Sequence, residues 1–343
     1  GPVEPGNGHE FLMIASAPMR SIVVREFGAP SVMQVEESAT PAPGAAQVLV
    51  RVHAAGVNPV DTYIRSGVYA IKPALPFTPG IDGAGVVEAV GSDVTTWKKG
   101  DRVYLFNDNS GTPRTGTYAD HMLCGPTQIG RLPGNVSFAQ GAAIGVPYGT
   151  VYYALLRRAQ ARPGETILIH GASGGVGIAA VQAARALGMT VIGTAGTERG
   201  MGAVEDAGAH VVVNHRTDGY VDAITKATHG RGADVILEMN AHLNLDKDLT
   251  LLARQGRLVL IGNRGRIEID PRAIMAREAT VTGMVLFNMP AAEFAWVHAA
   301  IGAGLANGTL RPVVNRELPL AEAPAAHDAV LESGAVGKIV LVP

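Results

Sequence analysis

A glycine-rich turn between an apolar strand and an Ala-rich helix is the feature that most constrains this chain. The run Thr166–Ile169 precedes the turn His170–Gly177 (HGASGGVG), and a helix is predicted over 176–187. Such a turn lets backbone N–H groups approach a pyrophosphate, and the helix N-terminus adds partial positive charge. Because strand, turn and helix follow in this order, the motif predicts a dinucleotide-binding unit rather than a tight turn without a ligand.

Short strands and helices alternate between residues 141 and 290. This alternation predicts an α/β fold with a doubly wound parallel sheet of the Rossmann type. The predicted strands are 166–170, 190–193, 211–213, 234–238, 257–262 and 281–287. The predicted helices are 142–158, which Pro147 can break, then 176–187, 199–207, 220–228 and 245–253.

The residues before 141 are rich in strands punctuated by glycine and proline. Strands are predicted at 47–54 and 83–91, a turn over 99–104 leads into a third strand, and no helices alternate with them. A helix over 291–306 leads out of the dinucleotide-binding domain, and a last strand over 338–342 is expected to return to the β-rich part. We therefore predict one domain from 13–140 with 291–343 and another from 141–290, with the ligand site in the cleft between them. Residues 1–12 read as a cloning remnant, with native sequence from near Met13.

Composition limits the possible functions. The net charge is only −2 and no basic block occurs, so nucleic-acid binding as the main function is not expected. No apolar run approaches the roughly 20 residues that span a bilayer. A single cysteine, Cys124, excludes an internal disulfide and is predicted to be an inert core thiol. With no secretory signal, the expectation is a soluble cytoplasmic protein.

The second predicted strand of the wound sheet indicates which nicotinamide cofactor is bound. NAD-binding folds place an Asp or Glu at the tip of this strand to hold the ribose 2′-hydroxyl. Here the tip reads Gly193–Thr197, which leaves room for a 2′-phosphate and favours NADPH. Arg199 could pair with that phosphate, although Glu198 beside it would repel it. The alternative is that Glu198 takes the NAD role from one turn later.

The chain lacks the usual zinc-binding patterns. A catalytic zinc ion needs three protein ligands and a structural one needs four. One cysteine rules out a four-thiolate site, and none of the ten histidines forms an HExxH motif or a close pair. The sequence therefore predicts chemistry without a metal.

Several segments, which follow one another in the same order along the chain, resemble the medium-chain dehydrogenase/reductase superfamily. Within it they resemble the zeta-crystallin-like NADPH:quinone oxidoreductases. The resemblance runs from about residue 20 to 343 and implies a β-rich GroES-like catalytic domain. Zinc-dependent relatives carry Cys at position 58 and Gly-His-Glu at 80–82, where this chain has Asn58 and Gly80-Ile81-Asp82. Departures are Asn240–His242 and the loop 107–114. The matching segments are 56–60, 62–67, 78–80, 170–177, 193–198, 214–216, 244–245, 247–249, 264–265 and 267–269.

The resemblance implies most of a cofactor-binding set. The phosphates would be held by Ser173, Gly174, Gly175 and Val176, and the adenosine side by Gly196 and His215. The ribose and nicotinamide would be held by Asn244, Ile261, Gly262, Asn263, Arg264, Met284, Val285 and Leu286, with Tyr63 beside the nicotinamide. Strand-end positions support His215 and Arg264 independently. Lys338 is a further candidate. Each of these three residues also has an ordinary alternative role. His215 would be a structural histidine, Arg264 would form a surface ion pair, and Lys338 would be a solvated surface lysine.

The predicted reaction is hydride transfer from NADPH to a small-molecule quinone, which needs orientation more than acid–base catalysis. The resemblance equally permits one-electron transfer that gives a semiquinone, and the sequence does not choose between the two. Asn58 and the hydroxyls of Tyr63, Tyr69 and Tyr148 are the candidates for stabilising charge on the quinone oxygen. Ordinary roles for them are an Asx turn and side-chain packing.

Two alternative functions stay open. One is reduction of an activated C=C bond in an enal or enoyl thioester, with Tyr69 as the proton donor. The other is a non-enzymatic crystallin-like or RNA-binding role, which no basic or aromatic-rich segment supports. The apolar strand 281–287 invites pairing with another copy, and the resemblance implies a homodimer or homotetramer.

Overall fold

The sheet that carries the glycine turn has six parallel strands in the order β10-β9-β8-β11-β12-β13. We describe it from a computed structural model that covers residues 18–70, 72–106 and 113–343. The central strands are buried on both faces, which is why they read as continuous apolar runs. The predicted Rossmann-type sheet is confirmed. Its strands are β8 (Thr166–Ile169), β9 (Thr190–Ala195), β10 (Val211–Asn214), β11 (Ala233–Glu238), β12 (Leu252–Leu260) and β13 (Thr280–Gly283).

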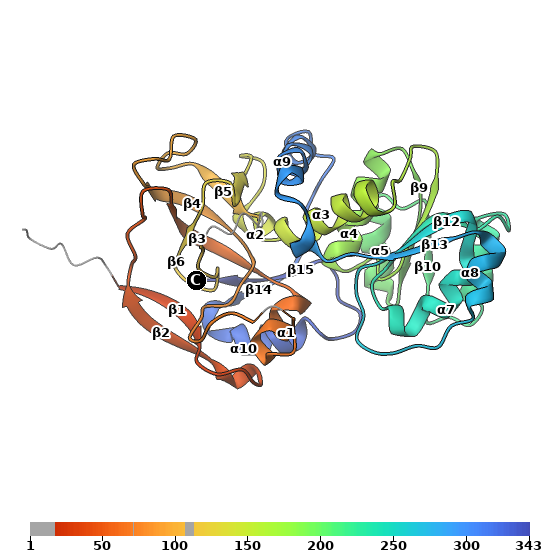
Figure 1. Ribbon diagram of the computed structural model, residues 1–343, viewed down its shortest axis with the longest axis horizontal. Coiled ribbons are helices and arrows are strands. Elements are labelled where there is room, and N and C mark those ends of the chain that lie inside the picture. Colours follow the sequence, from red (N-terminus) through yellow and green to blue (C-terminus); the bar gives the residue numbers. More distant parts are fainter. Residues whose placement is uncertain (1–17, 71, 107–112) are drawn as a thin grey trace, which may run out of the picture.

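Helices flank this sheet in the half of the molecule drawn green to cyan in Figure 1. The predicted break at Pro147 does not occur, because Pro147 lies in the first turn of its helix, where no N–H is needed. The strand predicted over 281–287 ends at Gly283, and Leu286–Asn288 form a 3-10 turn. The helices are α3 (Gly145–Tyr152), continued by a π-helical turn, then α4 (Gly175–Ala186), α5 (Glu198–Asp206), α6 (Tyr220–Ala227), α7 (Ala241–Leu251) and α8 (Pro271–Arg277).

The other half is a seven-stranded sheet with a separate two-stranded ribbon, β1-β2. The last strand, β15, pairs antiparallel with β3, so the predicted return of residues 338–342 to the β-rich part is confirmed. The strands are β1 (Pro18–Val24), β2 (Met33–Ala39), β3 (Val48–Val57), β4 (Asp82–Val90), β5 (Arg102–Leu105), β6 (His121–Cys124), β7 (Ile129–Arg131), β14 (Val314–Pro319) and β15 (Lys338–Val342). The helices are α1 (Pro59–Ser66), α2 (Phe138–Gly141) and α10 (Ala323–Ala329).

The helix α9 (Ala291–Ala306) lies between the two halves at the top of Figure 1. Its Phe294 packs edge-on against Phe106 of the β-rich half, with ring centroids 5.1 Å apart. The same hydrophobic cluster includes Ile167 and Ile169 of the wound sheet, so one core joins both halves. The domain boundaries at 140 and 290 stay a prediction. No described helix combines the length and apolar character needed to cross a bilayer.

The turn after β8 depends on a close approach that only glycine allows. A Cβ added at Gly177 would lie 2.3 Å from the carbonyl oxygen of Gly171 and 2.5 Å from Ala172 Cα, which are backbone atoms. By contrast, a Cβ at Gly202 in α5 would meet nothing within 4 Å.

We therefore expect Gly177→Ala to lower the free energy of unfolding by about 1–3 kcal/mol, because the turn must shift to admit the methyl group. Gly202→Ala is the matched control and should raise stability by up to about 1 kcal/mol through helix propensity. Urea unfolding followed by circular dichroism measures both. Equal stability of the two variants would contradict the close approach.

Candidate functional site

The first turn of α4 offers free backbone N–H groups at the end of β8. Gly174 is the N-cap, and its own N–H donates to the Gly171 carbonyl at 3.2 Å, so the free groups are those of Gly175 and Val176. All three residues are partly exposed. The first N–H groups of a helix have no partner within the helix, and the helix dipole favours an anion there. This geometry suits a pyrophosphate on the residues that the sequence predicts for it.

A segment of the β-rich half crosses this edge of the wound sheet. We call residues 331–337 the C-terminal strap. Its Gly337 N–H donates to the Ser173 carbonyl at 2.7 Å, and Ser173 Oγ donates to the Ala335 carbonyl at 2.8 Å. The strap therefore ties the β-rich half to the glycine turn. Sequence reasoning missed it, and the only signal was its paired glycines, Gly334 and Gly337, which both have positive φ.

Two arginines of the wound domain also reach the strap. Arg216, which follows β10, donates to Ser333 Oγ at 3.3 Å. Arg264, which follows β12, lies 3.5 Å from the Leu331 carbonyl. The strap thus passes the ends of three strands of the sheet, β8, β10 and β12.

The tip of β9 is surrounded by two side chains from the end of β10. A Cβ added at Gly196 would lie 2.7 Å from His215 Nε2 and 2.8 Å from Arg216 Nε. Burial lowers the pKa of His215, with Arg216 as a second cause, so its imidazole is neutral at neutral pH. Arg199 instead donates to Asn315 of the β-rich half. Arg216 is a residue that the cofactor prediction missed, although it stands in the matching segment 214–216.

A pocket of about 350 Å³ opens at the ends of β12 and β13. Gly262 is held there by a close approach, since a Cβ would lie 2.2 Å from the Met239 carbonyl oxygen. The neighbouring Asn244 amide donates to Glu238 Oε1 at 3.2 Å. Five predicted cofactor residues line this pocket. Its lining is Leu260, Ile261, Gly262, Asn263, Gly283, Met284, Val285 and Asn288.

A buried ion pair between Lys338 and Asp82 of the β-rich half lies beside the glycine turn. Lys338 Nζ lies 2.7 Å from Asp82 Oδ2 and also donates to Asn58 Oδ1, while Asn58 Nδ2 donates to Asp82 Oδ2 at 3.0 Å. The Lys338 and Asp82 side chains are only 4% and 1% exposed. The solvated surface role for Lys338 is therefore wrong. Its stem passes beside α4, because a Cβ added at Gly175 would lie 3.7 Å from Lys338 Cδ.

Further hydrogen bonds fix this ion pair. The other Asp82 oxygen accepts from the Val146 N–H of α3 at 2.7 Å. Asn58 caps α1, and its own N–H donates to Asp61 Oδ2 at 2.8 Å. Burial raises the pKa of Asp61 to about 7, against the lowering effect of that hydrogen bond. Both Asn58 and Asp82, at positions where zinc-dependent relatives carry Cys and Glu, thus bind an ammonium group.

The predicted tyrosines lie in different surroundings. Tyr63 and Tyr69 lie on and just after α1, both partly exposed. The Tyr69 ring meets Phe287 edge-on at 6.3 Å, next to the pocket residue Asn288, and burial raises its pKa. Tyr148 is 1% exposed and its hydroxyl donates to Gln182 Oε1 at 2.7 Å. The predicted role of the Tyr148 hydroxyl at the quinone in the cleft is therefore wrong, because this hydroxyl is buried in the core and hydrogen-bonded to Gln182. Of the loop 107–114, residues 107–112 lie outside the described residues.

Comparisons with known proteins find matches in both halves of the chain. The family model described as "Alcohol dehydrogenase GroES-like domain" matches residues 44–151, and the one described as "Zinc-binding dehydrogenase" matches 175–301. A Homo sapiens protein named quinone oxidoreductase is 48% identical over 94% of this chain and 98% of its own.

Solved structures agree. An Escherichia coli quinone oxidoreductase complexed with NADPH superposes with a TM-score of 0.83 at 31% identity, covering 94% of this chain and 100% of its own. An NAD-dependent alcohol dehydrogenase gives a TM-score of 0.86 at 28% identity over 94% and 99%. The chain belongs to the quinone oxidoreductase family of the medium-chain dehydrogenase/reductase superfamily.

Proposed function

We propose that this chain is an NADPH:quinone oxidoreductase that works without a metal ion. The observation that carries this proposal is the 48% identity to the human quinone oxidoreductase across nearly the whole of both chains. The buried Lys338 ammonium supports the metal-free reaction, since it binds the two side chains that would otherwise face a metal.

The residues at the ends of the parallel strands fit NADPH. The N–H groups of Gly175 and Val176 would hold the pyrophosphate next to Gly174, and Arg216 beside Gly196 would bind the 2′-phosphate through charge-assisted hydrogen bonds. Ile261–Asn263 and Met284–Val285 would enclose the nicotinamide and its ribose in the pocket that they line. When bound, NADPH supplies the hydride for the reduction.

The protein's own residues then have two tasks, orientation and charge stabilisation. A quinone becomes aromatic on reduction, so the step asks little acid–base help from the enzyme. Lys338 and Asp82 hold the buried Asn58 amide in place, and we assign its second amide N–H to a substrate oxygen. We assign Tyr63 to packing beside the nicotinamide and the Tyr69 hydroxyl to the oxygen that gains charge.

The edge of the wound sheet is the candidate surface for association with a second copy. β13 is an edge strand with one partner, β12, and Val285 just beyond it is 40% exposed. We propose that this edge pairs with a second copy in a homodimer or homotetramer. Light scattering should return at least twice the 35.5 kDa chain mass, and a monomer at micromolar concentration would rule the pairing out. A cytoplasmic location stays a prediction.

Steady-state turnover separates the quinone reaction from the reduction of activated C=C bonds. With NADPH, we expect fast turnover of 1,2-naphthoquinone and little of a crotonyl thioester. Tyr69→Phe and Asn58→Ala should each lower quinone turnover by about tenfold, the effect of losing one hydrogen bond in the transition state. A preference for the thioester that Tyr69→Phe abolishes would instead support Tyr69 as a proton donor and the alternative function.

Cofactor preference tests the arginine at the tip of β10. Arg216→Gln should raise the KM for NADPH by about 10- to 100-fold and leave the KM for NADH nearly unchanged, because only NADPH carries the 2′-phosphate. Arg199→Gln is the matched control and should change neither KM, since Arg199 is bound to Asn315. If the two variants exchange these results, Arg199 rather than Arg216 reads the phosphate.

A further inference from the structure

Three buried titratable side chains lie directly below the cofactor edge of the wound sheet. We call His170, Glu238 and Asp248 the buried cluster. His170 directly follows β8 at the start of the glycine turn, Glu238 is the last residue of β11, and Asp248 lies on α7. His170 is 4% exposed at its side chain and the two carboxylates are fully buried. None of them has a part in the proposed reaction.

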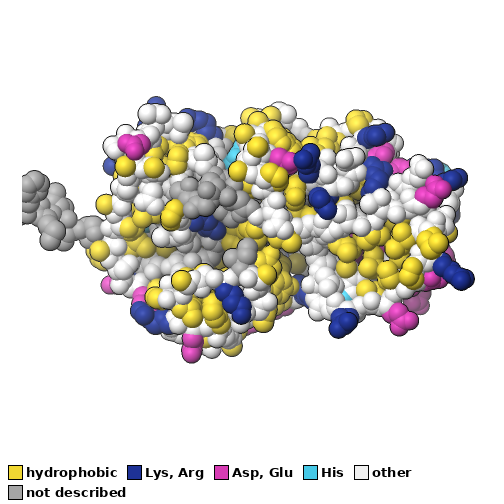
Figure 2. Space-filling model, in the orientation of Figure 1, with side chains coloured by type: hydrophobic (Ala, Val, Ile, Leu, Met, Phe, Trp, Pro, Cys, Tyr) yellow, Lys and Arg dark blue, Asp and Glu magenta, His cyan; other side chains and the backbone are white. Residues whose placement is uncertain are grey.

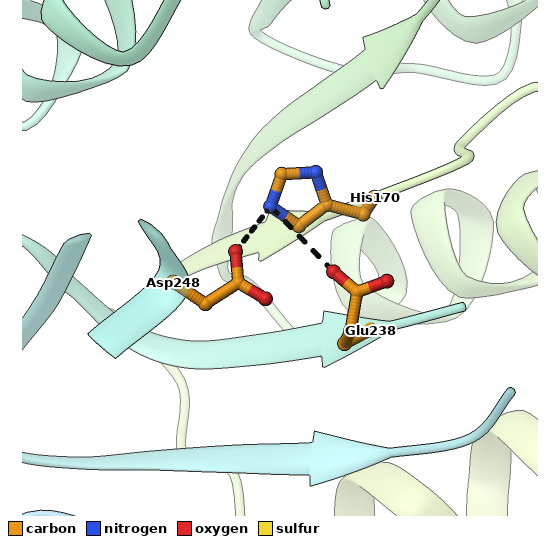
Figure 3. Close-up of side chains that lie close together, drawn as sticks. All are labelled: His170, Glu238 and Asp248. Carbon is orange, nitrogen blue, oxygen red and sulfur yellow. Dashed lines mark ion pairs between the residues drawn. The ribbon is translucent and has the colours of Figure 1, made fainter. Parts of the chain in front are cut away.

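The side chains point toward one another (Figure 3). His170 Nε2 lies 2.8 Å from Asp248 Oδ1 and 3.9 Å from Glu238 Oε2. Despite this short ion-pair distance, His170 Nε2, Glu238 Oε2 and both Asp248 oxygens make no hydrogen bond of acceptable geometry. Buried acceptors without a donor are costly, and two buried carboxylates repel each other. One proton shared between the two carboxyl groups engages Glu238 Oε2 and one Asp248 oxygen and removes the repulsion between two charges, and the other Asp248 oxygen is left to His170.

The cluster is connected to the cofactor site through Glu238. The second Glu238 oxygen, Oε1, accepts from the Asn240 N–H and from the Asn244 side-chain amide, the latter at 3.2 Å. Asn240 is the N-cap of α7, and Asn244 is the α7 residue predicted to hold the cofactor. Asp248 lies one turn further along the same helix. A change in the distance between the two carboxyl groups would therefore move the Asn244 amide.

We propose that the buried cluster is a positioning network that holds the Asn244 amide toward the cofactor, and that it does so only while its carboxyl groups share a proton. This inference rests on the proposed function. The cluster residues act through Asn244 and do not touch the cofactor or the substrate themselves.

A metal ion is the alternative occupant of the cluster, and the geometry disfavours it. Ligand atoms bound to one zinc ion at about 2.0–2.2 Å lie roughly 3 Å or more apart, whereas His170 Nε2 and Asp248 Oδ1 are in direct contact. The burial of all three side chains also leaves no visible entry path.

The pH range of the effect follows from the surroundings of the cluster. Burial raises the pKa of Glu238 and that of Asp248, each to about 7, and lowers the pKa of His170. The charge of Lys247 on α7 lowers the pKa of both Asp248 and His170. His170 Nδ1 lies 3.2 Å from the Thr194 hydroxyl of β9.

His215, at the end of β10, is the other titratable neighbour, and burial lowers its pKa. The carboxyl pKa values are raised, so the shared proton is present below about pH 7 and is lost above it. NADPH affinity should therefore fall as the pH rises through neutrality.

The first test measures the Kd for NADPH by fluorescence from about pH 6 to about pH 8.5. We expect the wild-type affinity to fall by about tenfold over this range, as for the loss of one hydrogen bond. Glu238→Gln keeps a neutral, hydrogen-bonding side chain, so it should bind as the wild type does at low pH and lose the pH dependence. Asp246→Asn, on the exposed face of α7, is the matched control and should keep the wild-type profile.

The second test is a double-mutant cycle. Glu238→Ala and Asn244→Ala should each raise the KM for NADPH by about tenfold and leave kcat with a quinone nearly unchanged. The double variant should be no worse than either single one, because both remove the same contact. If Glu238→Ala does not fold, as shown by circular dichroism, the pH profile of Asp248→Asn replaces the cycle as the second test and should also be flat.

Each outcome has a separate meaning. Full additivity in the cycle, or an unchanged pH profile in Glu238→Gln, overturns the positioning role while NADPH binding by the wild type stands. A wild type that does not bind NADPH at all overturns the proposed function itself. Zn²⁺ that tightens NADPH binding in the wild type but not in Glu238→Gln would show a metal site in place of a shared proton.

Discussion

The ion pair between Lys338 and Asp82 fixes the β-rich half at the place where it meets the wound domain. It links the start of β15 to the start of β4, the Asn58 amide holds the ammonium from the cap of α1, and the Val146 N–H of α3 binds the second carboxylate oxygen. Removing one member of such a buried pair costs about 3–5 kcal/mol, because the other charge is left without a partner. Few other contacts unite so many elements at one point.

This arrangement explains how a fold shared with zinc-dependent enzymes can serve a metal-free reaction. The Lys338 ammonium binds Asn58 and Asp82, at the positions where zinc-dependent relatives carry Cys and Glu. The strap that leads into Lys338 is hydrogen-bonded to the glycine turn. These hydrogen bonds connect the cofactor edge to the β-rich half. The charged side chains on the face drawn in Figure 2 are scattered over both halves, without a continuous basic patch among the described residues, which fits a small-molecule enzyme better than an RNA-binding protein.

Local patterns predicted the wound sheet well, because its strands are continuous apolar runs and its turn is glycine-rich. Helix 291–306 and the return of β15 were predicted from the same signals. Contacts between residues distant in sequence were not: the burial of Lys338, the commitment of Tyr148 to Gln182 and the position of Arg216 beside Gly196 depend on how the two halves and neighbouring strands meet. No periodicity in a single sequence encodes these distances.

The central claim is that the buried ammonium makes a metal unnecessary for quinone reduction. The most direct measurement is NADPH-dependent quinone turnover by the purified protein after exhaustive treatment with EDTA and 1,10-phenanthroline. The account predicts an unchanged rate and no response to added zinc. A loss of turnover that zinc restores would contradict it.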